Sequence, residues 1–367
     1  MIWVKELIDK LVNFYVRPRN IGVRIIRTSF SLLAVLAASG GISVVIRSLD
    51  SSSELSLSWG DGPGAIAFWV LLVVALIGVA FGFWLAKRHD DYDLNVKQVS
   101  RVFVVELRGL VDTTDSPLIN AVPVELVGRR ESCLVDIRRL VAGKVPNIQE
   151  ALSELLQLQR QLRLVRTGTS REHVTVVVGG VMQVSLLFYA GVLLDDEGKV
   201  LLFEWERAGK KWMELSQPDD GGRFDIVGLD ELAVHSSDVV VAVSATYFVD
   251  LVGIAQTFPS MPIVHLQLSD PKPNRLWSEA TQVELARQFT DLMAELANRS
   301  VRTVHLILAA SPTLCIRFGQ AYDHRNMPYV NCYQRERDQV PPYPWSVRLE
   351  GNEPGKFEKT SSSVVCQ

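Results

Sequence analysis

Residues that could hold an anion or a nucleobase gather where predicted strands give way to helices. Three such junctions are made of Gly179, Gly180, Met182 and Gln183; of Ser244, Ala245, Thr246 and Tyr247; and of Ala310, Ser311, Pro312 and Thr313. Ser311 suits a helix N-cap and Pro312 suits the first helical position. Backbone N–H groups at helix starts favour a phosphate, although small residues after a strand also serve tight packing of the helix.

The ends of two predicted strands add aromatic, polar and charged side chains, namely Glu204, Trp205, Arg207, Tyr333, Gln334, Arg335 and Arg337. Aromatic rings stack on bases and arginine pairs with phosphate. Because side chains alternate along a strand, about half of these face a pocket. The sequence has no G-x-x-x-x-G-K-[ST], H-E-x-x-H or G-x-S-x-G motif, and no close set of histidine, cysteine and carboxylate. It therefore predicts binding rather than catalysis, with no metal and no cofactor.

The elements that position these residues alternate in type from Arg101 to Glu350. Apolar, β-branched runs predict strands at 102–107, 133–137, 174–178, 199–205, 239–244, 262–268, 303–308 and 329–334. Amphipathic patterns predict helices at 147–165, 182–194, 247–257, 278–298 and 312–324. Such alternation is typical of an α/β fold with a mostly parallel sheet, in which ligands bind beyond the carboxyl ends of the strands.

An internal repeat divides this region into two halves. Residues 154–207 align without a gap with residues 284–337, at an offset of 130, and the order helix, strand, helix, strand is the same in both. The repeat predicts a pseudo-two-fold pair of Rossmann-like halves. Two equivalent loops across a pseudo-dyad would suit a cyclic ligand with repeated phosphates.

Composition limits the function classes. Of 367 residues 48% are hydrophobic and 22% are charged, which indicates a globular part plus membrane spans and excludes a disordered chain. The net charge of −3 argues against a basic surface for duplex nucleic acid. The four cysteines are far apart in the sequence, which fits a reducing cytosol rather than a disulfide scaffold.

Two uncharged stretches, residues 28–46 and 65–86, are long enough to cross a bilayer as helices. Basic residues flank them at Arg24, Arg27, Lys87 and Arg88, whereas the charged residues of the loop 47–64 are Asp50, Glu54 and Asp61, with Arg47 at its edge. The positive-inside rule then predicts a multi-pass protein of the inner membrane with both termini in the cytoplasm and the loop in the periplasm. Residues 1–27 are expected to be an amphipathic segment and 87–100 a linker.

Small residues recur at helical spacing within both stretches. Gly78 and Gly82 form a G-x-x-x-G pair, and Ala37 and Gly41 form a similar pair. Such pairs let membrane helices approach closely, so they are expected to pack the spans, although glycine is also ordinary in membrane helices.

Three segments carry a family resemblance: TVHLILAASPTLCIRFGQAYDHRNMPYVNCYQRER (303–337), VTVVVGGVMQVSLLFYAGVLLDDEGKVLLFEWER (174–207) and residues 238–268. They resemble SAVED domains, which implies two fused CARF-like Rossmann folds over 101–350 and a disordered tail at 351–367. With two spans ahead, the chain is similar to the two-transmembrane SAVED effectors of CBASS antiphage defence. The first junction, Gly179-Gly180-Val181, departs from the family, whose members often have bulkier or more aromatic residues there. The resemblance therefore does not imply which bases the ligand carries.

The resemblance implies a membrane-anchored effector that is not an enzyme. Its SAVED domain would bind a cyclic oligonucleotide made by a CD-NTase on phage infection, a cyclic trinucleotide being favoured over a cyclic dinucleotide. Binding would cause self-association, and the helices would disrupt the inner membrane, giving abortive infection. Two alternatives stay open: a membrane-tethered ring nuclease that hydrolyses the ligand, and a constitutive membrane scaffold.

Overall fold

The computed structural model describes residues 21–38, 42–49, 52–59, 63–141, 146–194, 198–233, 236–351 and 353–360. The chain divides into two compact units, Met1–Gln98 and Val99–Gln367. Of the expected amphipathic segment 1–27, residues 1–20 lie outside the described residues.

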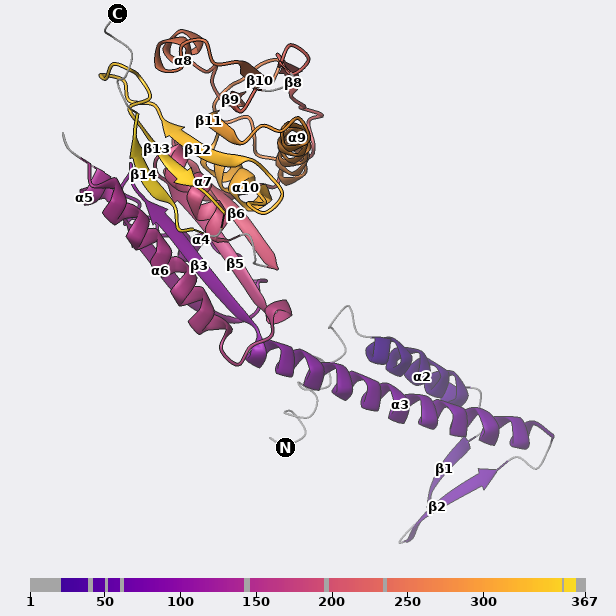
Figure 1. The fold of residues 1–367 in the computed structure, drawn as a ribbon. Coiled ribbons are helices and arrows are strands. Elements are labelled where there is room, and N and C mark those ends of the chain that lie inside the picture. Colours follow the sequence, from indigo (N-terminus) through magenta and orange to yellow (C-terminus); the bar gives the residue numbers. More distant parts are fainter. Residues whose placement is uncertain are drawn as a thin grey trace, which may run out of the picture. The chain divides into compact units, whose positions relative to one another are not determined.

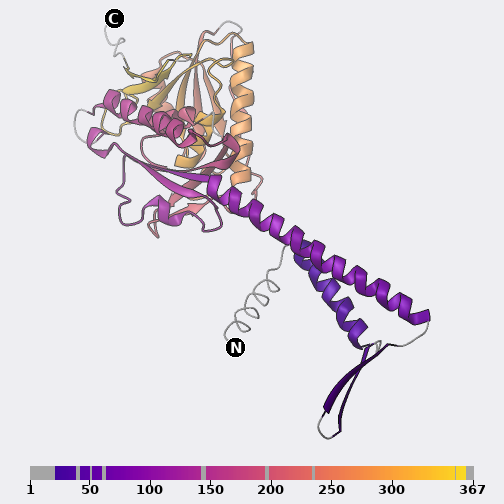
Figure 2. The same cartoon turned by 90° about the horizontal axis from the view of Figure 1, so that it is seen from below.

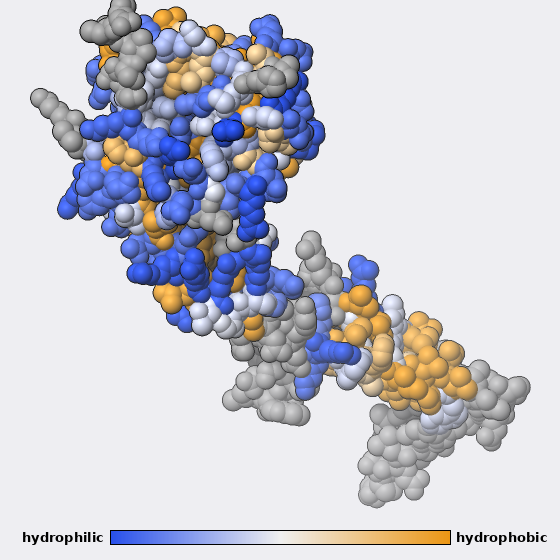
Figure 3. All heavy atoms as spheres, viewed as in Figure 1, coloured by the Kyte–Doolittle hydropathy of each residue, from blue (hydrophilic) through white to orange (hydrophobic). Residues whose placement is uncertain are grey.

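The first unit is a helical hairpin whose loop is a pair of strands. Helix α2 (Ile21–Ala38) is followed by β1 (Ile42–Leu49), β2 (Ser52–Trp59) and α3 (Pro63–Val99). Figures 1 and 2 show α2 lying along α3, and Figure 3 shows apolar residues gathered over this helix pair. Among the described residues, one helical segment, Trp69–His89, is long and apolar enough to cross a membrane.

Three boundaries expected in this unit are wrong. The first helix covers 21–38 rather than 28–46, and residues 42–46 belong to β1, which pairs antiparallel with β2 across the expected loop 47–64. The reason is a Ser-Gly-Gly sequence after Ala38, unfavourable inside a helix, followed by a run rich in β-branched residues at 42–46, while residues 55–59 alternate apolar residues with serines at the two-residue period of a strand. The expected linker 87–100 is helical as far as Val99.

The G-x-x-x-G pair packs inside the hairpin. A β-carbon on Gly82 would stand 2.6 Å from Ile26 Cγ1 and 2.9 Å from the Gly22 carbonyl oxygen, and Gly78 lies against the side chain of Ser29. Gly78 and Gly82 therefore pack α3 on α2 of the same chain. Of the other predicted pair, Gly41 and the side chain of Ala37 lie outside the described residues.

The second unit is built on two mixed sheets whose central strands are parallel. One has the order β4-β3-β5-β6-β7, formed by Arg129–Asp136, Arg101–Arg108, Val174–Val181, Lys199–Glu206 and Lys211–Glu214. The other has the order β14-β13-β12-β11-β9-β10-β8, formed by Lys356–Lys359, Trp345–Leu349, Tyr329–Gln334, Thr303–Ala309, Asp238–Ser244, Ile263–Gln267 and Asp225–Val227. Strands β7, β8, β13 and β14 pair antiparallel with their neighbours.

Helices connect and cover these strands. They are α4 (Leu118–Ala121), α5 (Arg138–Val141), α6 (Ile148–Arg166), α7 (Val184–Leu193), α8 (Leu251–Thr257), α9 (Glu279–Asn298) and α10 (Pro312–Ala321), with a short 3₁₀ turn at Arg171–His173. Helices α7 and α10 pack on each other at the centre of the unit (Figure 1). One hydrophobic core joins them to both sheets.

Each strand and helix expected between Arg101 and Glu350 is present within a few residues of its expected bounds. The expected disordered tail 351–367 is wrong in part, because Lys356–Lys359 form β14 at the edge of the second sheet. Residues 361–367 lie outside the described residues.

The repeat is confirmed, but the offset between equivalent residues changes from 128 to 130 along it. The Val181 carbonyl accepts from the N–H groups of Gly109 and Leu110, and the Ala309 carbonyl accepts in the same way from Ala245 and Thr246. Val181 thus corresponds to Ala309, an offset of 128, whereas β6 and β12 keep the offset of 130. The connection after the second helix is two residues longer in the second half.

Candidate ligand-binding site

A cavity of about 410 Å³ lies where the central strands of both halves end. The start of α7 reaches it through Met182 and Val184, and the start of α10 through Ala310 and Pro312. Both helix starts open toward the same space because the halves are related by the pseudo-dyad. Unpaired N–H groups in the first turn of a helix attract anions, so this cavity suits a ligand that carries phosphates.

Two arginines supply positive charge to the cavity. Arg335 lies just beyond β12, and its guanidinium is 3.0 Å from Asp250 Oδ2. The hydrogen bond from the Gly253 N–H, followed by the one from Arg335, lowers the pKa of Asp250. Arg207 lies beyond β6 on the other side of the pseudo-dyad and is exposed. Since the side chain of Arg335 is 47% exposed, it is free to exchange its carboxylate partner for a ligand phosphate.

Aromatic side chains stand at the rim of the cavity. Tyr247 and Phe248 follow β9 and are 50% and 64% exposed, which is unusual for large apolar side chains. Exposed aromatic faces next to arginines are the combination on which bases stack while phosphates are paired.

A smaller cavity of about 60 Å³ adjoins the first at the start of α10. Its wall includes the carboxylate of Glu204, whose Oε2 accepts from the Thr313 hydroxyl at 2.6 Å and from the Thr313 N–H at 3.1 Å. Burial raises the pKa of Glu204 to about 7, while the bonds from Thr313 favour the charged form. Glu204 thereby ties the first sheet to the helix of the second half.

The predicted site residues fall into three groups. Those that line the larger cavity are Met182, Tyr247, Ala310, Pro312, Tyr333, Gln334 and Arg335. Those that line the smaller cavity are Glu204, Trp205, Thr246, Tyr247, Ala310, Ser311 and Pro312. Those that line neither are Gly179, Gly180, Gln183, Ser244, Ala245, Thr313 and Arg337. Strands that end at one edge thus bring together most of the residues singled out from the sequence.

The prediction that Gly179 and Gly180 belong to the junction between a strand and a helix is wrong. Both lie within β5, where a β-carbon on Gly179 would stand 2.7 Å from the Trp212 ring and one on Gly180 2.8 Å from Leu187. These glycines make room for large neighbours under the sheet rather than for a ligand. The junction begins two residues later, and the N-caps of the two helices are Gln183 and Ser311.

The junction formed by residues 244–247 is also partly buried. Ser244 is fully buried, and its hydroxyl accepts from the Val249 N–H and lies 2.8 Å from His265 Nε2. A serine beside a histidine can be a nucleophile, but here the hydroxyl is enclosed and holds the following loop. Ala245 serves through its backbone N–H, which donates to Ala309.

Several lining residues were not predicted. They are Leu110, Val181, Val184, Leu187, Phe248, Val249, Asp250, Ile307, Leu308, Ala309 and Tyr343 at the larger cavity, and Pro273, Asn274, Leu276 and Trp277 at the smaller one. Arg207, which was expected at a strand end, lines both cavities. The loop 273–277 had no signal in the sequence, because it follows an ordinary buried strand.

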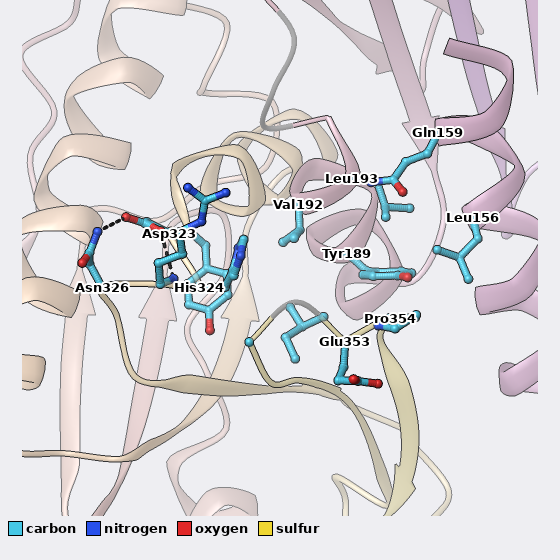
Figure 4. Close-up of a pocket in the computed structure, with 14 residues that line it drawn as sticks. Leu156, Gln159, Tyr189, Val192, Leu193, Asp323, His324, Asn326, Glu353 and Pro354 are labelled. Atoms are coloured by element: carbon cyan, nitrogen blue, oxygen red, sulfur yellow. Dashed lines mark hydrogen bonds between the residues drawn. The ribbon is translucent and has the colours of Figure 1, made fainter. Parts of the chain in front are cut away.

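A further cavity, of about 520 Å³, lies at the opposite ends of α7 and α10 (Figure 4). Tyr189 and Tyr322 line it, and their hydroxyl groups are engaged with Gly355 and Pro328. Helix C-termini repel anions, so the phosphate-binding features belong to the other end. The described residues contain no group of three or more metal-binding side chains.

Comparisons with known proteins agree with this architecture. The model of the family "SMODS-associated and fused to various effectors sensor domain", abbreviated SAVED, matches residues 158–349, more than half of the chain. The model of the "SAVED-fused 2TM effector domain" matches residues 1–152. The two matches meet within α6, whereas the compact units divide at Val99. No curated protein matches the sequence.

The solved structures that match the chain include Cap4 SAVED/CARF-domain containing receptors. That of Acinetobacter baumannii with the cyclic trinucleotide 2'3'3'-cAAA has 10% identity and a TM-score of 0.46, and the match covers 77% of this chain and 55% of that one. The same receptor with 3'3'3'-cAAA has 9% identity and a TM-score of 0.46, covering 77% and 59%. That of Moraxella osloensis has 11% identity and a TM-score of 0.43, covering 69% and 50%. The chain spans only half to three fifths of these structures.

The two halves, the central helix pair and the family match agree with one another. The chain belongs to the SAVED family and carries a SAVED-fused 2TM effector region ahead of its sensor domain.

Proposed function

We propose that the SAVED domain is a receptor for a cyclic oligonucleotide, a cyclic trinucleotide being favoured over a cyclic dinucleotide. The observation that carries the proposal is the cavity of about 410 Å³ at the pseudo-dyad, onto which two helix starts open and in which Arg207 and Arg335 face a common space. A ring with repeated phosphates and bases matches that pseudo-symmetry, and Tyr247 and Phe248 offer faces for its bases.

Calorimetry on the full chain in detergent tests this. We expect saturable binding of 2'3'3'-cAAA, 3'3'3'-cAAA or a cyclic dinucleotide from a panel of all four bases, and no binding of the linear trinucleotides. If no cyclic oligonucleotide of the panel binds to folded protein, the receptor proposal is wrong, and a constitutive scaffold becomes the better description.

The effector function follows from the region ahead of the sensor. We propose that a ligand made by a CD-NTase on infection drives self-association, and that the helical hairpin then disrupts the inner membrane and causes abortive infection. The described segment Trp69–His89 holds no charge before its last turn, so membrane voltage has nothing to move within it. The free energy for switching must come from ligand binding, and a ligand shifts an equilibrium only by its differential affinity for the two states. Ligand-dependent dye leakage from vesicles carrying the full chain is the expected result.

We further propose that the protein is multi-pass in the inner membrane with both termini in the cytoplasm. The basic residues at Arg24, Arg27, Lys87 and Arg88 against the acidic segment 50–61 support this orientation. A C-terminal reporter that is active only in the periplasm would contradict it.

The receptor is proposed to leave its ligand intact. The buried carboxylate of Glu204 is turned to Thr313, and the Ser244 hydroxyl is enclosed, which supports binding without hydrolysis. Incubation of the protein with a bound cyclic oligonucleotide, followed by chromatography, is expected to return the ligand unchanged. Linear products formed at a rate proportional to protein would favour the ring-nuclease alternative.

A further inference from the structure

The strands of the first sheet begin at one end of the second unit, and this end is rich in arginine. Arg101 begins β3 and Arg129 begins β4, and the strand register pairs these two residues. Arg101 Nε donates to the Thr169 hydroxyl, so the turn after α6 lies at the same place (Figure 1). The segments 99–101, 122–131 and 160–173 meet here and hold seven arginines against three glutamates. In a chain with a net charge of −3, this end is positively charged.

Apolar side chains stand exposed among these arginines. Val124 is 86% exposed and Val127 43%, in the loop before β4, and Leu164 is 68% exposed in the last turn of α6. The guanidinium of Arg130 donates to two carbonyl oxygens of that loop, at 2.7 and 3.2 Å, and holds it in place. Single exposed apolar residues are ordinary, but several beside one another mark an interaction surface.

The arginines of this end are accessible. The side chain of Arg129 is 77% exposed, and Arg163 is also exposed. Arg160 and Arg163 line an open hollow of about 320 Å³, and no carboxylate is among its lining residues. Arginines in the last turn of a helix also serve the helix dipole, but the dipole gives no reason for Arg129 at a strand start or for the exposed valines. Arginine pairs with lipid phosphates while apolar side chains enter the boundary between headgroups and acyl chains, so the combination suits an anionic bilayer.

The chain itself brings this end to a membrane. The apolar segment Trp69–His89 is long enough to span one. Helix α3 continues from it for ten residues, about 15 Å of helix, to Val99, two residues before Arg101. A few arginines bind a bilayer weakly when free, but a tether turns the contact into an intramolecular one at high effective concentration.

We propose that this end of the SAVED domain docks on the anionic phospholipid surface of the cytoplasmic leaflet, with its arginines paired to lipid phosphates and Val124 inserted among the headgroups. The inference rests on the proposed membrane anchoring with a cytoplasmic SAVED domain. The docking face comprises the starts of β3 and β4, the loop before β4 and the end of α6. Residues 195–197 before β6 are acidic, so the start of β6 is not part of it. The ligand cavity lies at the carboxyl ends of the strands, so docking leaves it accessible.

A fluorescent label on the full chain in vesicles tests the docking. The polarity-sensitive probe NBD is attached to Val124→Cys or, as a matched control, to Val340→Cys, since Val340 is 92% exposed in the loop after β12. Both variants also carry Cys366→Ser, and the other three cysteines are buried. In phosphatidylcholine with about 30% phosphatidylglycerol, an anionic lipid, the label at 124 should emit at shorter wavelength and be quenched by nitroxide-labelled lipid. The label at 340 should do neither. About 1 M salt, at which the Debye length is about 3 Å, should reduce the response at 124.

Charge-reversed variants identify the cause of the response. Arg129→Glu combined with Arg163→Glu should abolish it at 124. Lys272→Glu combined with Arg337→Glu changes the net charge equally, beyond the carboxyl ends of β10 and β12, and should keep it. All four residues are exposed, so both variants should melt like the parent.

Three results would overturn the inference. The labels at 124 and 340 respond alike, or the Arg129 and Arg163 variant still responds. The third is a response at 124 that is the same in neutral vesicles and grows with the number of chains per vesicle, because a second copy would then cover this face. A chain that does not enter vesicles would refute the proposed anchoring and this inference with it. The receptor proposal is tested separately, by ligand binding.

Discussion

Gly191 on α7 and Gly319 on α10 lie against each other, so that a β-carbon on either would stand 2.9 Å from the Cα of the other. The contact is reciprocal: Gly191 faces the carbonyl oxygen of Ile316, and Gly319 faces that of Phe188, three residues earlier on each helix. The pseudo-dyad therefore passes through this glycine pair. Because α7 and α10 both start at the ligand cavity, the pair also sets the distance between the two helix starts.

A methyl group at this crossing should destabilise the protein. Gly191→Ala and Gly319→Ala each press a β-carbon on backbone atoms of the partner helix, which cannot rotate away. Overpacking of this kind costs about 1–3 kcal/mol, so each variant should melt roughly 2–10 °C below the parent for a domain of this size. The measurement is thermal unfolding of the full chain in detergent. The matched control is Gly198→Ala, whose β-carbon would meet only ordinary contacts of 3.5 Å or more.

The fold of the second unit could be predicted because its elements carry strong local signals. Apolar β-branched runs such as 239–244 and amphipathic runs such as 278–298 appear as β9 and α9. The edge strands could not be predicted in this way, because β8 and β14 hold three and four residues and gain their regularity from a neighbouring strand. The same applies to β1 and β2, which lie where an apolar stretch favoured a span.

The sequence predicted where the site lies more readily than which side chains line it. Junctions after strands identified both helix starts, but residue identity did not tell a turn glycine from a core glycine. Gly179 is required by the Trp212 ring, which arrives from β7, a strand with no sequence signal of its own. Arg335 and Arg337 looked alike in the sequence; β12 ends at Gln334, and only Arg335 lines the cavity.

Alanine at the two cavity arginines, Arg207 and Arg335, should weaken ligand binding, whereas alanine at Arg337 should not. A charge-assisted contact to phosphate contributes about 1.5–3 kcal/mol, so Arg207→Ala and Arg335→Ala should each weaken the binding of a cyclic oligonucleotide roughly tenfold or more. Arg337→Ala is the matched control, because Arg337 is exposed and lines neither cavity. Calorimetry of the three variants checks this. Equal losses in all three would mean that net charge, rather than the cavity, determines affinity.

The buried carboxyl of Glu204 should give the stability a pH dependence. Burial raises its pKa to about 7, so the folded state disfavours the charged form. The stability present at low pH is lost as the pH rises toward and through 7, by up to about 3 kcal/mol. Glu204→Gln has no such titration, so its melting temperature minus that of the parent should rise between pH 5 and pH 8. A flat difference for Glu204→Gln would show that the carboxyl is not desolvated.

The membrane activity of the helical hairpin should require the glycine contacts between α2 and α3 of one chain. Gly82 lies against Gly22 and Ile26 of α2, so Gly82→Ile forces the two helices apart, and Gly22→Ile presses on the same place from the other side. If the hairpin is the part that enters the membrane, both variants should lose ligand-dependent vesicle leakage to a similar extent while the SAVED domain still binds ligand. Val74→Ile is the control, since Val74 is 53% exposed on α3 and tolerates an added methyl group. Leakage that persists in both glycine variants, with the protein still in the vesicles, would show that the lesion is built without the α2–α3 contact.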